Sequence, residues 1–264
     1  MLKSSFIHVP GVGYKTERYI WGKGVFSWED FLVSYNKVGL PDGKIERIKS
    51  HVTLSIAHLQ NRNVHFFAEA LPKSEIWRVY SEFKDKVAFL DIETTGLSAY
   101  YSDITLIGIF DGKDAKTYIA GKNLDSFVED IKQYDLMVTF NGTLFDAPFI
   151  ATKFSDFVPP PHIDLRFLLK RLGYSGGLKK VERQLGVMRP EGIKDLNGFD
   201  AVILWNRYMR GDIDALDLLI EYNLADVTVL KVLMEEGYRR MQNRLLPEYN
   251  LWKEGNKHEK EEIR

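Results

Sequence analysis

Cysteine is absent from this chain of 264 residues. Disulfide bonds and thiolate metal sites are therefore excluded, and any metal must be held by oxygen or imidazole ligands. Such ligands favour Mg²⁺ or Mn²⁺ over structural zinc. An excess of one charge is missing too, because 36 basic residues stand against 37 acidic ones. Nucleic acids are bound mainly through lysine and arginine near the phosphates, so a nucleic-acid enzyme would need these residues concentrated locally.

Features of membrane and exported proteins are also missing. No apolar run reaches the length of about 20 residues that a transmembrane helix needs. The N-terminus lacks the basic start, apolar stretch and small-residue cleavage site of a secretory signal. We therefore expect a cytoplasmic protein without a membrane partner. Hydrophobic residues make up 45% of the chain, which suffices for one large domain or two modest ones.

Residues 1–85 show helical patterns. Ser27 and Asp30 have the spacing of a capping box, in which each side chain bonds to the backbone amide of the other residue. Apolar residues recur at roughly helical spacing over residues 43–60, and Lys73 is predicted to open another helix that runs towards Phe83. This part of the chain is therefore predicted to be a small helical segment.

A change to strand patterns begins at residue 86. Apolar runs predict strands at 87–90, 105–110, 116–119 and 136–140, and Asp111-Gly112 is typical of a hairpin turn. A helix is predicted near 124–133, and the chain beyond residue 144 is predicted to be mostly helical. The pattern indicates an α/β fold with a mixed sheet flanked by helices. We place this domain at residues 86–240, followed by an extension, 241–264, whose end we expect to be frayed.

Two acids, Asp91 and Glu93, lie where the first predicted strand ends. Side chains two apart on a strand point to one side, so these carboxylates face the same space. Neighbouring anions repel each other, and a bound cation would offset that cost. The turn that follows, with Thr94 and Gly96, would let the backbone approach a ligand. Acid pairs are also common on solvated surfaces, so this pair alone decides little.

Further acids follow in a suitable setting. Asp146 comes after the fourth strand at the start of a predicted helix, where capping that helix is an alternative role. Asp226 lies one helical turn after Tyr222, so both side chains project from one face. The alternatives are a core tyrosine and a solvated charge, but apolar neighbours place this acid where it needs a partner.

The three motifs together resemble those of the DEDDy group of 3′–5′ exonucleases, which have a ribonuclease H-like fold. They are Asp91-x-Glu93, the stretch from Asn141 to Asp146, and Tyr222-x₃-Asp226. The resemblance covers about residues 86–236 and is closest to the proofreading domain of family-B DNA polymerases and to YprB-like proteins.

This resemblance implies phosphodiester hydrolysis with two divalent cations, Mg²⁺ or Mn²⁺, which activate water and stabilise the leaving oxygen. It implies that Asp91 bridges both ions, that Glu93 and Asp226 complete the shell of one, and that Asp146 anchors the other. Tyr222 would orient the attacking water, since the pKa of a free tyrosine, near 10, makes it a poor base.

Substrate contacts are expected near the acids and in the N-terminal segment. Beside the acids, the expected residues are Thr94, Gly96, Leu97, Asn141 and Phe145. A basic segment, with Lys179, Lys180 and Arg183 after Arg166, Lys170 and Arg171, would hold the substrate backbone, although solvated charges are an equal alternative.

The N-terminal contact is expected at Gly11, Gly13 and Lys15. These residues resemble the hairpin of helix-hairpin-helix modules, in which backbone N–H groups at a helix start bind a phosphate. A purely structural turn explains the two glycines equally well. Elsewhere, we expect His162 to be structural and Asp164 to cap a helix, and we expect the acids at 212, 214 and 217 to be helix-entry and surface charges.

The expected function is a metal-dependent 3′–5′ exonuclease of single-stranded nucleic acid, with DNA favoured over RNA. A role in DNA repair or replication would need a partner protein. One alternative is a nucleic-acid-binding protein with a catalytically silent nuclease fold, although none of the four acids is missing. Another is a structure-specific endonuclease, because a fold does not fix a function.

Overall fold

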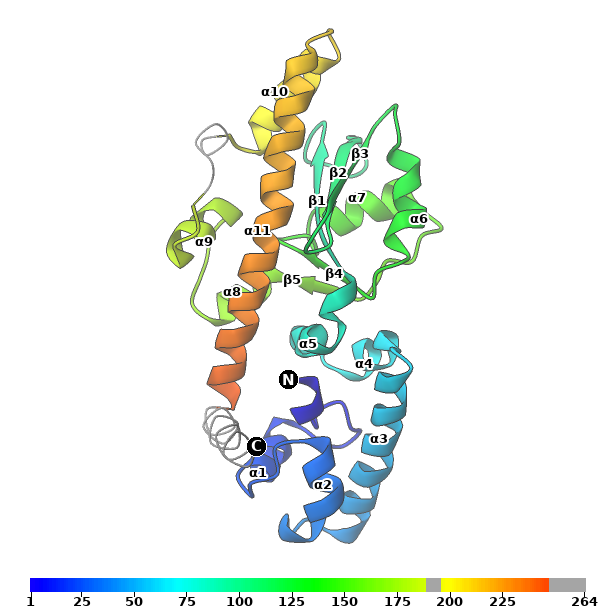
Figure 1. Ribbon diagram of the computed structural model, residues 1–264, viewed down its shortest axis with the longest axis vertical. Coiled ribbons are helices and arrows are strands. Elements are labelled where there is room, and N and C mark those ends of the chain that lie inside the picture. The colour runs from blue at the N-terminus through cyan, green and yellow to red at the C-terminus, as the bar shows by residue number, and fades with distance from the viewer. Residues whose placement is uncertain (189–195, 247–264) are drawn as a thin grey trace, which may run out of the picture. The chain divides into compact units, whose positions relative to one another are not determined.

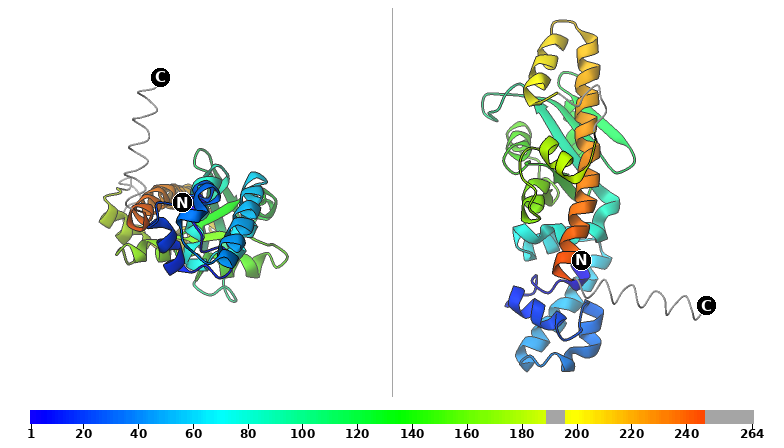
Figure 2. Two further views of the ribbon diagram at one scale, coloured as in Figure 1. Left: turned by 90° about the horizontal axis from the view of Figure 1, so that it is seen from below. Right: turned by 90° about the vertical axis from the view of Figure 1, so that its left-hand side faces the viewer.

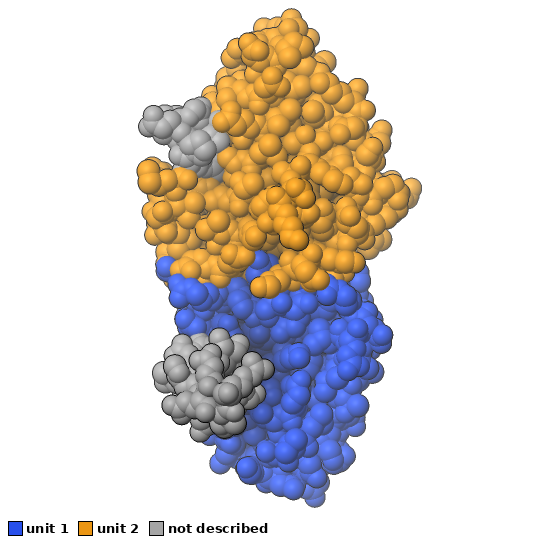
Figure 3. Space-filling model, viewed as in Figure 1, with its two compact units in different colours: residues 1–83, 238–264 blue, residues 84–237 orange. Residues whose placement is uncertain are grey.

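The computed structural model describes residues 1–188 and 196–246. The chain divides into two compact units, coloured separately in Figure 3. The helical unit comprises residues 1–83 and 238–246, and the sheet unit comprises the described residues of 84–237. The frayed end that we expect near the C-terminus lies outside the described residues.

Helices make up the regular structure of residues 1–83, and no strand occurs among them. The predicted capping box is confirmed, since the Asp30 amide donates to Ser27 Oγ and the Ser27 amide to Asp30 Oδ2, both at 3.0 Å. The segment after Lys73 forms a 3₁₀ helix and then a short α-helix. The elements are η1 (Leu2–Ser4), α1 (Tyr14–Trp21), α2 (Trp28–Ser34), η2 (Tyr35–Lys37), α3 (Asp42–Gln60), α4 (Val64–Ala70), η3 (Lys73–Val79) and α5 (Tyr80–Phe83).

A buried ion-pair cluster joins these helices. The Arg78 guanidinium, fully buried, donates to Glu17 Oε1 at 2.8 Å and to Glu75 Oε2 at 2.7 Å. Glu17 Oε1 also accepts from the backbone amide of Phe6 at 2.7 Å. Buried charges cost several kcal/mol each unless they are paired and hydrogen-bonded. Because its acceptors come from α1 and η3, Arg78 fixes both elements and the start of the chain.

The sheet unit contains a mixed sheet with the strand order β3-β2-β1-β4-β5. β1 (Val87–Thr94), β2 (Ile104–Phe110) and β3 (Ala115–Ile119) are antiparallel to their neighbours in this group. β4 (Leu136–Thr139) and β5 (His162–Asp164) extend the sheet in parallel with β1. The predicted α/β class and the first four strands are confirmed.

The chain beyond residue 144 is mostly helical, as predicted, but it also contains a fifth strand that the sequence did not predict. β5 pairs with β4 through Met137 and His162, Val138 and Ile163, and Thr139 and Asp164. Its three residues are too few to form a recognisable strand pattern, and its hydrogen bonds run to a strand more than twenty residues away in the chain. Only the tertiary fold therefore defines this strand.

Each face of the sheet packs against its own set of helices (Figures 1 and 2). Ile107 and Ile109 of β2 face α6 (Phe127–Ile131) and α7 (Asp146–Lys153). Leu106 faces α10 (Gly198–Tyr208) and α11 (Ile213–Leu245). The remaining elements of this unit are η4 (Lys84–Lys86), η5 (Leu124–Ser126), α8 (Leu165–Arg171) and α9 (Leu178–Leu185).

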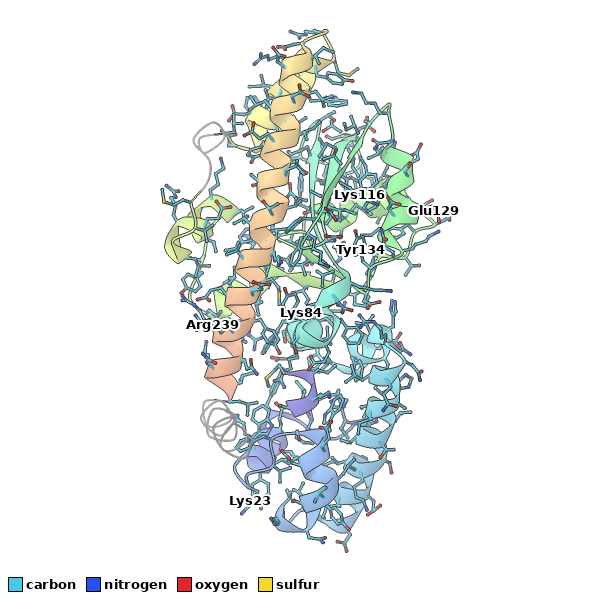
Figure 4. All side chains as sticks on the ribbon, viewed as in Figure 1. Lys23, Lys84, Lys116, Glu129, Tyr134 and Arg239 are labelled. Carbon is cyan, nitrogen blue, oxygen red and sulfur yellow. The ribbon has the colours of Figure 1, made fainter. Side chains whose placement is uncertain are left out.

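Surface charges add little to this packing. Lys116 of β3, labelled in Figure 4, pairs with Asp130 of α6 at 3.1 Å, and its side chain is half exposed. Exposed ion pairs contribute about 1 kcal/mol or less. Within the described ranges, no helix combines the length and the apolar composition that crossing a membrane requires.

Replacing Arg78 tests the buried cluster. We expect Arg78→Met to lower the free energy of unfolding by about 3–5 kcal/mol, because two buried carboxylates lose their positive partner. The matched control is Lys3→Met, which breaks the exposed pair of Lys3 with Glu29 (3.7 Å) and should cost less than about 1 kcal/mol. Urea unfolding curves measure both values. A loss for Arg78→Met as small as that of the control contradicts this account.

Candidate active site

Asp91 and Glu93 reach the site from β1, the central strand of the sheet. Asp91 pairs with Gly108 of β2, and Leu106 pairs with Glu93, so both carboxylates lie on the face that α11 covers. Asp91 is partly exposed, whereas Glu93 is buried. The prediction that the two side chains share one side of the strand is confirmed.

Tyr222 and Asp226 reach the same face from α11, one helical turn apart. Both side chains are buried. One carboxylate oxygen each from Asp91, Glu93 and Asp226 lies within 4.8 Å of the other two. The fold thus brings together acids that are up to 135 positions apart in the chain (226 − 91 = 135).

Asp146 is the first residue of α7, and the N-cap position belongs to Phe145. The capping role considered for Asp146 is therefore not the one it has. Its carboxylate is 3% exposed, and its Oδ1 has no hydrogen-bond partner among the described residues. A buried carboxylate oxygen without a partner costs free energy unless a cation or water reaches it.

A cavity of about 470 Å³ connects these acids. All four carboxylates and Tyr222 line it, together with the turn after β1, the second motif and the start of α10. Leu97 and Phe199 line it as well, and their side chains are largely exposed. Of the expected substrate contacts, those in the lining are Thr94, Gly96, Leu97, Asn141 and Phe145.

The second motif is held in place by Asp164. Its carboxylate accepts from the backbone amides of Asn141 at 2.8 Å and Thr143 at 3.0 Å. Asn141 adopts a positive φ of 69°, a conformation that non-glycine residues rarely take, so this turn needs outside support. Asp164 also accepts from the Arg166 amide at 3.0 Å, which confirms the predicted cap of α8. The sequence showed the cap but not the two amides some twenty residues upstream.

Neighbouring side chains complete this turn. His162 Nε2 lies 2.8 Å from Thr139 Oγ1, a structural bond of the kind predicted for this histidine. The same Thr139 Oγ1 accepts from the Gly142 amide at 3.1 Å. The Arg166 guanidinium bonds to Asn141 Oδ1.

The other expected nucleic-acid contacts do not line the cavity. On α9, Lys180 and Arg183 are exposed, while the Lys179 ammonium lies 5.4 Å from the centroid of the Tyr222 ring. Of the three basic residues expected on α9, Lys179 is therefore the one whose ammonium lies against Tyr222. Gly11, Gly13 and Lys15 are exposed residues of the helical unit, and Gly13 is the N-cap of α1. Asp212, expected at a helix entry, accepts from the Ala215 amide at 3.3 Å and pairs with Arg207.

Burial and crowding change the acidity of the site. Burial, together with the nearby Asp226 carboxylate, raises the pKa of Glu93 to about 8, although a hydrogen bond from Asn223 acts in the opposite direction. Burial likewise raises the pKa of Asp146 to about 7, with contributions from Asp164 and Asp226. Without a cation, burial therefore favours the protonated forms of Glu93 and Asp146.

The donor set fits a hard divalent cation. All four candidate ligands are carboxylates, which suit Mg²⁺ and Mn²⁺. A cation beside Glu93 and Asp226 would offset their repulsion, and one beside Asp146 would satisfy its buried oxygen. One group of ligands consists of Asp91, Glu93 and Asp226. The fourth ligand, Asp146, comes from α7.

Comparison with known protein families agrees with this fold. Residues 88–238 match the RNase_H_2 family, which is part of the RNase H superfamily. This match spans more than half of the chain, which therefore belongs to that superfamily and has a nuclease fold. No curated protein matches the chain.

The solved structures that are similar to this chain include an archaeal DNA polymerase and Brucella melitensis NrnC. The family B DNA polymerase of the archaeon Pyrobaculum calidifontis is 17% identical, with a TM-score of 0.48 over 57% of this chain and 24% of the polymerase. The chain thus spans about a quarter of that polymerase. Brucella melitensis NrnC with bound Mg²⁺ is 20% identical, with a TM-score of 0.45 over 62% of this chain and 78% of NrnC.

The raised pKa values predict how the metal-free protein responds to pH. Because the pKa of Glu93 rises from about 4.5 to about 8 on folding, the folded state binds more protons than the unfolded state in this window. The contribution of Glu93 to the stability of the folded state is therefore fully present below pH 4.5 and is lost as the pH rises through 8. We expect the melting temperature in chelator to fall over this range, and to fall less in Glu93→Gln.

Thermal unfolding in chelator at several pH values measures this effect. The matched control is Glu129→Gln on α6, an exposed residue labelled in Figure 4, which should leave the pH dependence of wild type unchanged. Equal pH slopes for Glu93→Gln and wild type would show that Glu93 is not the group responsible.

Proposed function

We propose that this chain is a metal-dependent 3′–5′ exonuclease that hydrolyses phosphodiester bonds at the ends of single-stranded nucleic acid. The observation that carries the proposal is that one cavity is lined by the four carboxylates, those of Asp91, Glu93, Asp146 and Asp226, and also by Tyr222. Membership of the RNase H superfamily supports a nuclease. The order and spacing of the acids support the exonuclease group.

The carboxylates hold the cations in this proposal. Asp91, Glu93 and Asp226 form one ligand group within 4.8 Å, and Asp146 supplies a ligand from α7. Two divalent cations, Mg²⁺ or Mn²⁺, would supply the acidity that activates water and the positive charge that stabilises the leaving oxygen. Because the ligands come from a central strand and two helices, their geometry is set before substrate arrives.

Tyr222 orients the attacking water in this proposal. Its side chain is 6% exposed and lines the cavity one turn before Asp226. The Lys179 ammonium beside its ring adds positive charge next to the site, where a scissile phosphate would lie. Water orientation requires only the hydroxyl, so the tyrosine need not ionise.

The cavity's border suits unpaired bases. Leu97 and Phe199 are 90% and 71% exposed and line the same cavity as the acids. Apolar and aromatic side chains hold splayed bases through their faces, with little dependence on sequence. This supports a single strand, either DNA or RNA, as substrate. Gly11, Gly13 and Lys15 remain a predicted second contact, at the exposed start of α1.

Labelled oligonucleotides test the activity. With 5′-labelled single-stranded DNA or RNA and Mg²⁺ or Mn²⁺, we expect a ladder of products that shorten from the 3′ end. Chelator and Asp91→Ala should both abolish it, because the bound cations are lost. The control Thr228→Val, which changes an exposed side chain of α11, should retain wild-type activity. Products from a 3′-blocked strand would indicate an endonuclease, and no products with either metal would indicate a binding protein.

Tyr222→Phe separates the tyrosine from the acids. The variant keeps the ring and loses only the hydroxyl, so we expect kcat to fall by on the order of 10²-fold while metal affinity is retained. Single-turnover rates at saturating Mn²⁺ measure this. A rate equal to that of wild type would remove Tyr222 from the proposed machinery, and a rate as low as that of Asp91→Ala would make the hydroxyl indispensable.

A further inference from the structure

Asn223 lies between Tyr222 and Asp226 in the chain and is fully buried. Its side-chain Nδ2 is 3.0 Å from Asp91 Oδ2 and 3.5 Å from Glu93 Oε1, and it also lies 3.3 Å from the Asp91 backbone oxygen. One amide group therefore contacts both acids of the first motif. No role was predicted for Asn223, because its partners lie 130 and 132 positions earlier in the chain.

The orientation of this amide follows from its neighbours. All three atoms around Nδ2 are acceptors, so the NH₂ end must face them. The opposite end, Oδ1, is buried and has no hydrogen-bond partner among the described residues. An unpaired buried oxygen is costly, so the favourable contacts of this side chain are those to Asp91 and Glu93.

Gly108 provides the space for this arrangement. It lies on β2 directly opposite Asp91, and its backbone does not have the left-handed conformation that requires glycine. A Cβ at this position would overlap with Asn223 Oδ1 and lie 3.0 Å from Asn223 Cγ. Val227, the next residue of α11 to approach, would be 3.2 Å away. The missing side chain at position 108 therefore admits the Asn223 amide.

We propose that Asn223, seated on Gly108, is a positioning residue that orients the Asp91 and Glu93 carboxylates for cation binding. The inference rests on the proposed function. A neutral donor suits this task because it fixes both carboxylates and leaves their negative charge for the cation. A lysine or arginine at the same place would compete with the cation for that charge.

The Mn²⁺ affinity of variants tests this role. Asn223→Leu keeps a similar volume and removes the donor, and Gly108→Ala leaves the donor but takes its space. We expect each to weaken Mn²⁺ binding by roughly 10–100-fold, the usual effect of losing a group that orients a metal ligand. Isothermal titration measures the affinity, and melting curves in chelator show that each variant is folded. Thr228→Val, on the exposed side of α11, should bind Mn²⁺ like wild type.

A double-variant cycle links the two positions. If Gly108 serves only to admit the amide, Gly108→Ala should cause no further loss of Mn²⁺ affinity in an Asn223→Ala background. Additive losses would overturn the link between Gly108 and Asn223. Nuclease assays add a second readout, since raising the Mn²⁺ concentration should restore most of the activity of Asn223→Leu, as expected for weakened metal binding.

The outcomes separate this inference from the proposed function. If wild type binds Mn²⁺ and both Asn223→Leu and Gly108→Ala bind it within twofold of wild type, the positioning role alone is overturned. If wild type binds no more Mn²⁺ than Asp91→Ala does, both the metal-dependent function and the positioning role are overturned. Weak Mn²⁺ binding by Asn223→Leu and Gly108→Ala, with wild-type binding by Thr228→Val, would support the positioning role.

Discussion

Repulsion among buried carboxylates is the constraint on which the sheet unit depends. Glu93, Asp146 and Asp226 are each at least nine-tenths buried, and burial together with mutual repulsion raises the pKa of Glu93 and of Asp146. No local preference of the chain would gather these groups, since each would be better solvated alone. Their proximity becomes favourable when a positive charge lies among them, and a donor set made only of carboxylates suits a hard divalent cation.

The surrounding elements hold the acids against this repulsion. β1 is bonded on both sides, to β2 and to β4, so the strand that carries Asp91 and Glu93 cannot easily move. Asp164 ties down the turn that leads to Asp146, through backbone amides on both sides of Gly142. α11 approaches β2 closely at Gly108 and places an amide between the acids. Three separate elements thus fix ligands that would otherwise spread apart.

Local patterns were sufficient to predict the class of fold and to single out the four acids as candidates. The runs at 87–90 and 105–110 are apolar because both faces of these strands are covered, and the acids stand out at the strand end. The spacing of Tyr222 and Asp226 reports a shared helix face, and the structure places both in the cavity. In each case the information lies within a few neighbouring residues.

Features that depend on distant partners could not be predicted in this way. β5 is defined by its bonds to β4, and the second role of Asp164 by amides some twenty residues upstream. Asn223 looked like an ordinary helix residue, because Gly108 and Asp91 become its neighbours only in the folded chain. The burial of Arg78 could not be predicted for the same reason, since its partner Glu17 lies 61 positions before it in the chain. Sequence patterns report local geometry, and these contacts are not local.

The central claim is that the four acids form a cation site, and a crystal structure with Mn²⁺ tests it most directly. Data collected at the manganese absorption edge locate the ion by its anomalous scattering, independently of any assay. The account predicts a strong anomalous peak in the cavity, bonded to carboxylate oxygens of Asp91, Glu93 and Asp226, with a second peak beside Asp146. A map from crystals at saturating Mn²⁺ with no peak among these carboxylates would contradict it.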